Sequence, residues 1–337
     1  MSRRQSGFTR ASSLGPIADV VSRQGGSILR VLRDVDLPVA LLDTPEMLVP
    51  LREQFRLLER AARTTGDAEF GARLGCDVRI RNLSAFGKWV SEADDLSGAI
   101  DRSKRGLNRM LQSSTALTLT VLGPTAQWSI EFLDPECEGR YHNELLGLGY
   151  MIDAVRCYAG AAWSPDLILV TSPRGTPKGR LEQILDAEVS TGHGMPAIQF
   201  DARLLSNRAV RVAPADATRG PHPIEPPVPG EADDLASIEA VTALALSEAY
   251  PRIDWVAAKL GLTRRTLQRR LAERGTTFAA LVEVLLRKSA QELLARTAEP
   301  ITDIALRLGY ADMAHFTRAF KRWTGVAPST YRRSSNC

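Results

Sequence analysis

Four side chains near the C-terminal end of the chain could read the base edges of duplex DNA. They occupy the outward positions of a helix predicted over residues 264–274: Arg264, Arg265, Gln268 and Arg269. Leu267 and Leu271 recur four residues apart and face the other way. An arginine fork matches the O6 and N7 acceptors of guanine, and a glutamine amide can pair with N6 and N7 of adenine. This face therefore favours readout in a major groove.

A second donor-rich helix is predicted further along the chain. Its candidate base-reading residues are His315, Thr317 and Arg318, although His315 alone is equally compatible with a structural role. Phosphate contacts fix the register of a protein on DNA without reading its sequence. The candidates for that role flank both helices: Thr263, Lys321, Arg322, Arg332 and Arg333.

The segments ahead of both helices predict the elements that position these side chains. Before the second helix, an apolar stripe marks a short helix: Ile301, Ile304, Ala305 and Leu308. Gly309 ends that helix, because glycine adopts a positive φ at little cost, and Asp312 can cap the next one. The same pattern occurs 48 residues earlier, from Ile253 to Gly261. The chain is therefore predicted to carry two helix-turn-helix units.

Residues 278–294 connect the two units. They carry one apolar face and predict a single helix that fixes the spacing of the two recognition helices. Successive major grooves on one face of DNA lie about 34 Å apart. The expected binding site is asymmetric and roughly two helical turns long per protomer.

The C-terminal region resembles the signature of the AraC/XylS family of bacterial transcription regulators. The matching residues are Ile301, Ile304, Ala305, Gly309, Tyr310, His315, Phe316, Arg318, Phe320, Lys321, Gly325, Pro328, Tyr331 and Arg332. Met313 and Ala314 depart from the polar residues that many members carry there. The resemblance implies a sequence-specific regulator, more often an activator, that binds promoter DNA and engages RNA polymerase.

The charge distribution agrees with this interpretation. Residues 235–337 hold 16 Lys and Arg against 9 Asp and Glu, whereas residues 1–234 hold 27 against 30. Positive charge confined to one end indicates a phosphate-binding module joined to a part that does not touch nucleic acid. A run of six prolines predicts a linker over residues 212–233, followed by an all-α DNA-binding domain over residues 234–337.

The amino-terminal half is expected to form an α+β sensing or dimerisation domain over residues 25–211. Residues 1–24 are expected to form a disordered tail, because their first part is polar and rich in Ser and Arg. Helical periodicity follows up to Arg109. The later elements are expected in this order: a β-hairpin of Leu117–Val121 and Trp128–Phe132, a helix over 145–163, a strand over 167–170, a helix over 181–187 and a strand over 197–200.

Residues 33–211 resemble the amino-terminal domain of ornithine-utilisation regulators of the same family. The resemblance lies in the order of the helical and strand segments and in the break Trp163-Ser164-Pro165. The resemblance implies sensing of a small-molecule effector or self-association as a homodimer. Five side chains could line an effector pocket or belong to an ordinary core: Trp128, Tyr150, Arg156, Tyr158 and Trp163. The pattern assigns no effector and no effector-binding residue.

Nothing in the sequence favours catalysis. The cysteines are scattered, form no CxxC pair, and are expected to be reduced thiols: Cys76, Cys137, Cys157 and Cys337. No metal, cofactor or enzyme activity is expected. No apolar run approaches the roughly 18–20 residues of a membrane span, and no secretory signal is apparent, so a cytoplasmic, nucleoid-associated location is expected.

Two other classes of function remain open. One is a DNA-alkylation-responsive methyl acceptor, in which the same kind of DNA-binding module is fused to a domain with a reactive cysteine. The other is a non-specific architectural DNA-binding protein, which would prefer no duplex sequence over another.

Overall fold

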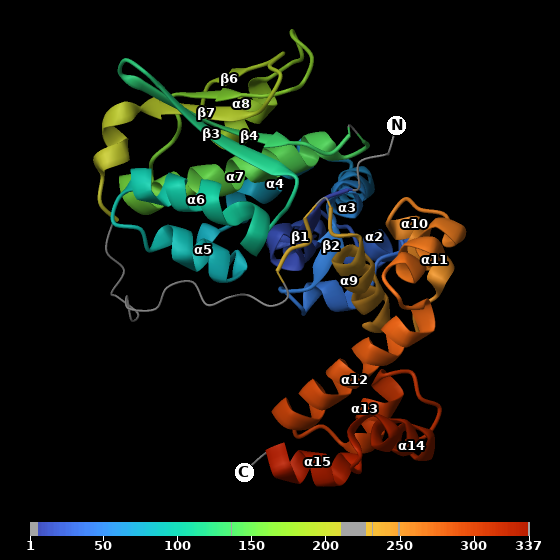
Figure 1. Ribbon diagram of the computed structural model, residues 1–337. Coiled ribbons are helices and arrows are strands. Elements are labelled where there is room, and N and C mark those ends of the chain that lie inside the picture. The colour runs from blue at the N-terminus through green and yellow to red at the C-terminus, as the bar shows by residue number, and fades with distance from the viewer. Residues whose placement is uncertain (1–5, 136, 210–226, 231, 249, 336–337) are drawn as a thin grey trace. The chain divides into compact units, whose positions relative to one another are not determined.

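The computed structural model describes residues 6–135, 137–209, 227–230, 232–248 and 250–335. The chain divides into two compact units (Figure 1). Residues 1–37 and 41–232 form the first unit, and residues 38–40 and 233–337 form the second.

The first unit combines helices with strands, which is the α+β class that the sequence predicted; its second, two-stranded sheet was not predicted. Its helices are α1 (Ile17–Arg23), α2 (Ile28–Asp34), α3 (Leu51–Thr65), α4 (Phe70–Asp77), α5 (Ser84–Ser91), α6 (Leu96–Met110), α7 (Arg140–Ala159) and α8 (Gly179–Leu185). Its short 3-10 helices are η1 (Ala11–Leu14), η3 (Ile80–Asn82) and η4 (Ala202–Ser206), and η2 (Val39–Leu42) has residues assigned to each of the two units. Asp95 caps α6, since its side chain accepts a hydrogen bond from the N–H of Gly98 at 2.8 Å.

The larger sheet has five strands in the order β3-β4-β7-β5-β6. They are β3 (Thr115–Leu122), β4 (Thr125–Phe132), β5 (Leu167–Leu169), β6 (Val189–Ser190) and β7 (Ala197–Asp201). Neighbouring strands are antiparallel except β5 and β6, which are parallel. The predicted hairpin is confirmed: Leu117 lies opposite Ile130, and Gly123 turns the chain with a φ of 59°.

Helix α7 organises the core of the first unit. It packs against the sheet, and α3, α4 and α6 pack against it (Figure 1). Its backbone touches that of α4, because a Cβ atom on Gly149 would lie only 2.4 Å from Cα of Gly75. The two glycines are therefore required by the close approach of the two helices.

The prediction of a disordered tail is wrong for residues 8–24. Phe8–Arg10 forms strand β1, which pairs antiparallel with β2 (Leu48–Pro50), and η1 and α1 follow. Arg10 is fully buried, and its guanidinium donates hydrogen bonds to the carbonyls of Met110 and Glu46. The segment is ordered because its polar groups find partners inside the core.

Most of the predicted linker, residues 212–226 and 231, lies outside the described residues. The described part includes Val228, which is buried and whose N–H donates to the carbonyl of Arg109 at 3.1 Å. The proline-rich segment is therefore anchored to the first unit near its end.

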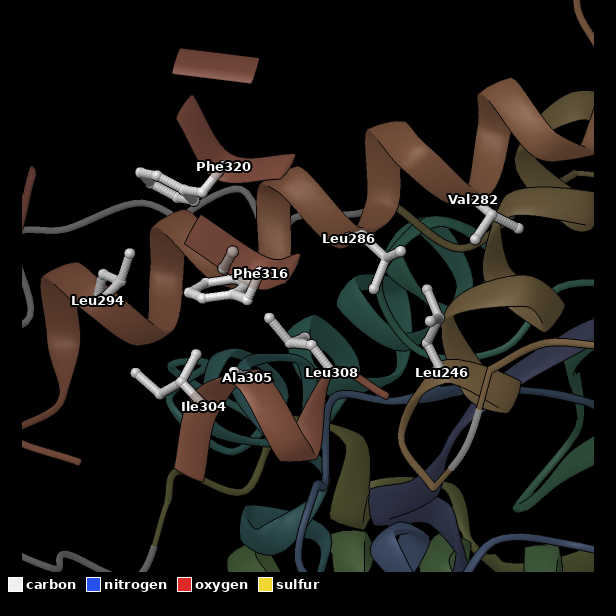
Figure 2. Close-up of a cluster of buried hydrophobic side chains, with 10 residues drawn as sticks. Leu246, Val282, Leu286, Leu294, Ile304, Ala305, Leu308, Phe316 and Phe320 are labelled. Atoms are coloured by element: carbon white, nitrogen blue, oxygen red, sulfur yellow. The ribbon is translucent and has the colours of Figure 1, made fainter. Parts of the chain in front are cut away.

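The second unit is all α in its described elements, as predicted. Its helices are α9 (Asp234–Leu246), α10 (Ile253–Lys259), α11 (Arg264–Glu273), α12 (Phe278–Arg296), α13 (Ile301–Arg307), α14 (Met313–Thr324) and α15 (Pro328–Ser335). Figure 2 shows Phe316 and Phe320 of α14 packed with Leu294 of α12 and Ile304 of α13. In the described ranges, no helix combines the length and the apolar character that crossing a membrane requires.

Candidate nucleic-acid interface

The first helix-turn-helix consists of α10 and α11. Gly261 turns the chain between them with a φ of 67°. Thr263 caps α11, because its Oγ1 accepts a hydrogen bond from the N–H of Thr266 at 3.1 Å. Leu267 and Leu271 are buried, which fixes the rotation of α11 about its axis.

The opposite face of α11 is exposed and rich in donors: Arg264, Arg265, Gln268 and Arg269. Arg264 lies 3.5 Å from Asp254, and Arg269 lies 3.8 Å from Glu273, both as exposed ion pairs. Such pairs are worth about 0–1 kcal/mol, so a DNA anion can replace them. The structure thus presents all four predicted base-reading side chains of α11 together.

The charge at the start of α11 opposes the stability of the isolated helix. Its first turn contains no acidic residue and carries Arg264 and Arg265 instead. The N-terminus of a helix is the positive end of its dipole, so cations placed there are unfavourable. An external anion such as a DNA phosphate relieves this repulsion.

The second helix-turn-helix consists of α13 and α14, with Gly309 at a φ of 82° between them. Asp312 caps α14 by accepting the N–H of His315 at 2.7 Å, and this hydrogen bond lowers the pKa of the carboxyl. Nδ1 of His315 also lies 3.0 Å from Asp312. His315 and Arg318 are exposed, and Thr317 is half-buried.

The predicted phosphate contacts fall into two groups. Thr263, Lys321 and Arg333 are exposed. Arg322 instead pairs with Glu283 of α12, and Nη2 of Arg332 donates to the carbonyl of Glu299 at 2.7 Å. Both arginines therefore have a partner within the second unit, and the exposed pair of Arg322 with Glu283 is of the kind that a phosphate can replace.

Sequence reasoning gave no reading role to Met313. It is the first residue of α14 and its side chain is 49% exposed. Apolar contact with the thymine methyl group belongs to direct readout. The signal available was its position one residue after the cap, because the N-terminal residues of the second helix contact base edges in helix-turn-helix proteins.

These features define a DNA-binding transcription regulator with two helix-turn-helix units. Residues 25–209 match the family model described as the arabinose-binding domain of AraC transcription regulators, N-terminal, and residues 256–334 match a helix-turn-helix domain model. The chain belongs to the AraC family.

Relatives of this chain are regulators of the same type. An uncharacterised HTH-type regulator of Mycobacterium bovis is 44% identical over 84 residues, which is 25% of this chain and 24% of that protein. The ornithine utilization regulator of Pseudomonas aeruginosa is 36% identical over 85 residues, 25% of each chain. The regulator VirS of Mycobacterium tuberculosis is 24% identical over 328 residues, 96% of each chain. The M. bovis match thus spans about a quarter of that relative, and the similarity to VirS spans both units.

Proposed function

We propose that this protein is a sequence-specific regulator that activates transcription in response to a small molecule. The observation that carries the proposal is the pair of helix-turn-helix units, each with an exposed donor-rich face and joined by the continuous helix α12. A rigid connection of this kind suits two recognition helices that enter successive major grooves.

Each part of the chain has a role in the proposal. Base reading is assigned to Arg264, Arg265, Gln268, Arg269, His315, Thr317 and Arg318, and phosphate contacts to Thr263, Lys321 and Arg333, with Arg322 and Arg332 as supporting residues. The first unit senses the effector and self-associates. RNA polymerase is the partner at the promoter. No catalytic step is proposed.

The test is selection of bound duplexes from a random library by the full-length protein, followed by mapping of occupied sites on genomic DNA. We expect enrichment of one asymmetric motif about two helical turns long. An architectural DNA-binding protein would instead bind all duplexes with one salt-sensitive affinity. Absence of any enriched motif would overturn the proposal.

The methyl-acceptor alternative finds no support in the described thiols. Cys76 and Cys137 are exposed and Cys157 is half-buried, yet partial desolvation by the surrounding protein raises the pKa of all three thiols. A raised pKa disfavours the thiolate, which is the nucleophilic form. Cys337 lies outside the described residues. Selective modification of one cysteine by a methylating agent would favour this alternative over the regulator proposal.

A further inference from the structure

Three helices of the first unit, α1, α4 and α8, border a surface cavity of about 530 Å³. Small-molecule sites in proteins have volumes of about 300–1,000 Å³. Each helix lines the cavity with residues at positions i, i+3 and i+4, which share one helical face. They are Val20, Arg23 and the capping residue Gln24 from α1, Arg73, Cys76 and Asp77 from α4, and Arg180, Gln183 and Ile184 from α8.

One arginine from each helix lines the cavity: Arg23, Arg73 and Arg180. Their side chains are 61%, 38% and 60% exposed, so all three reach solvent. Asp77 is the one carboxylate among the described residues that line the cavity. Residues 1–234 hold 27 Lys and Arg against 30 Asp and Glu, so this cluster of arginines is a local exception in a part of the chain that is acidic overall.

Asp67 holds two of these arginines in place. Its side chain is 5% exposed and is not part of the cavity lining. It accepts hydrogen bonds from Nε of Arg73 at 2.6 Å and from Nη2 of Arg180 at 3.2 Å, and also from Nε2 of Gln24 and the N–H of Glu69. A guanidinium carries five N–H groups, so each arginine keeps donors after one is used for Asp67. The buried carboxylate therefore orients two cations beside the cavity before any ligand arrives.

The third arginine has a different partner. Arg23 pairs with Asp77, and both residues line the cavity. A pair that is open to solvent contributes little stability, so a carboxylate of a ligand can take the place of Asp77. The cavity thus offers two points of positive charge, one at Arg73 and Arg180 and one at Arg23.

The aromatic and basic side chains singled out from the sequence are not among the described residues that line this cavity: Trp128, Tyr150, Arg156, Tyr158 and Trp163. Trp128 and Tyr150 instead line a cavity of about 70 Å³ elsewhere in the first unit. A cavity that admits benzene measures about 150 Å³, so the smaller cavity does not accommodate a molecule of that size.

We propose that the cavity between α1, α4 and α8 is the effector site and that it takes a small organic molecule with two carboxylate groups. One carboxylate is bound by Arg73 and Arg180 and the other by Arg23, because the planar fork of arginine matches a carboxylate. Val20 and Ile184 contact the carbon chain between the two groups. A cationic amine would meet like charges and is not a ligand. The regulatory consequence rests on the proposed function, but binding itself does not.

The experiment uses the full-length chain without DNA and three probes at matched ionic strength: succinate, acetate and the neutral succinamide. Cys76 lines the cavity, whereas Cys137 does not, and both thiols are exposed. The rate at which iodoacetamide modifies each thiol, measured by peptide mass spectrometry, therefore locates binding, and NMR titration of the ¹⁵N-labelled chain gives the affinity. We expect succinate to slow the modification of Cys76 but not of Cys137, and to bind about tenfold more tightly than acetate, because its second carboxylate adds charge-assisted hydrogen bonds. Succinamide should leave both rates unchanged.

Three variants that each lower the net charge by one make the result decisive. Arg180→Gln and Gln183→Glu change the cavity wall, and each should weaken the binding of succinate about tenfold. Arg105→Gln removes an exposed arginine of α6 that pairs with Asp101 and does not line the cavity, so it should leave the affinity unchanged. Arg180→Lys keeps the charge but not the fork, and should recover part of the affinity that Arg180→Gln loses.

Two results would overturn the inference. The first is no protection of Cys76 by succinate at tens of millimolar, and the second is equal weakening in all three charge variants, because the arginines would then serve only as surface ion pairs. Equal affinities for succinate and acetate would overturn the assignment of two carboxylates. Selection of a DNA motif would stand in each case, so failure here is distinct from failure of the proposed function.

Discussion

Oε1 of Glu283 on α12 accepts a hydrogen bond from Nε1 of Trp323 on α14 at 2.7 Å. The same oxygen pairs with Arg322. One carboxylate of the connecting helix therefore holds the C-terminal end of the second recognition helix, in addition to the apolar contacts of Phe316 and Phe320. The orientation of α14 depends on α12 through a polar as well as an apolar contact.

Glu283→Ala should lower the free energy of unfolding of the second unit by about 1 kcal/mol, because a charge-assisted hydrogen bond is lost at a half-exposed site. Thermal unfolding at several pH values measures this. Hydrogen bonds from Arg322 and Trp323 lower the pKa of Glu283, so the stabilisation is present above the unfolded pKa of about 4.5 and disappears as the pH falls below it. Glu292 is an exposed carboxylate on the same helix, and Glu292→Ala should have little effect on this free energy of unfolding. Equal losses of stability in both variants would contradict the role of Glu283.

Arg265→Ala should relax base preference at one or two positions of the selected motif. The loss of one bidentate contact corresponds to about 1–3 kcal/mol of discrimination. Competition binding against single-base variants of the motif measures it. Arg274→Ala removes the same charge at the C-cap of α11, far from the N-terminal end of the helix, and should leave base preference intact. If Arg265→Ala instead lowered the affinity for every DNA sequence by the same factor, Arg265 would be a phosphate contact.

Replacing Gly147 or Gly149 of α7 by alanine should change the stability of the first unit in opposite directions. Gly149→Ala forces a Cβ atom to within 2.4 Å of Gly75 and should destabilise the first unit by about 1–3 kcal/mol. Gly147→Ala meets no clash and should stabilise it by about 0.5–1 kcal/mol, since alanine favours the helix. Chemical denaturation of the two variants provides the comparison. Similar stabilities would mean that α4 and α7 are not in backbone contact.

The first unit should lose stability as the pH falls below about 6.5. Burial lowers the pKa of His142 from its usual value of 6.5. Above pH 6.5 the His142 ring is neutral in the folded and in the unfolded chain. Below pH 6.5 the unfolded chain takes up a proton, whereas the folded chain binds it only at lower pH. The free energy of unfolding therefore decreases as the pH falls. His142→Gln should flatten this slope between pH 6.5 and pH 5 in denaturant titrations. An unchanged slope would exclude His142 as the source.

The second unit was largely predictable because its signals are local. The caps Thr263 and Asp312, the glycines of the two turns and the leucine stripe of α11 all act within about two helical turns. The roles of Arg322 and Arg332 were not predictable, since their partners Glu283 and Glu299 lie 39 and 33 residues away. A charged side chain looks the same in sequence whether it meets a phosphate or a carboxylate.

The fold class of the first unit was predictable, but the structure of its N-terminal segment and the roles of its glycines were not. Arg10 appeared to belong to a polar tail, yet it is buried because Glu46 and Met110, far along the chain, accept its hydrogen bonds. Gly147 and Gly149 are indistinguishable in sequence. The difference lies in their neighbours: a methyl group on Gly147 would fit against Ile130, whereas one on Gly149 would collide with the backbone of Gly75.

The strand β1 also bears on how this chain is made. The N–H of Gly7 donates to the carboxylate of Asp134 at 2.9 Å, and that of Phe8 donates to Oγ of Ser113 at 2.9 Å. On the ribosome, residues 7 and 8 emerge more than a hundred residues before these partners. The nascent chain must therefore carry an unpaired edge until the hairpin has been translated. Slow translation across that interval would prolong exposure of Phe8 and Leu48 to chaperones.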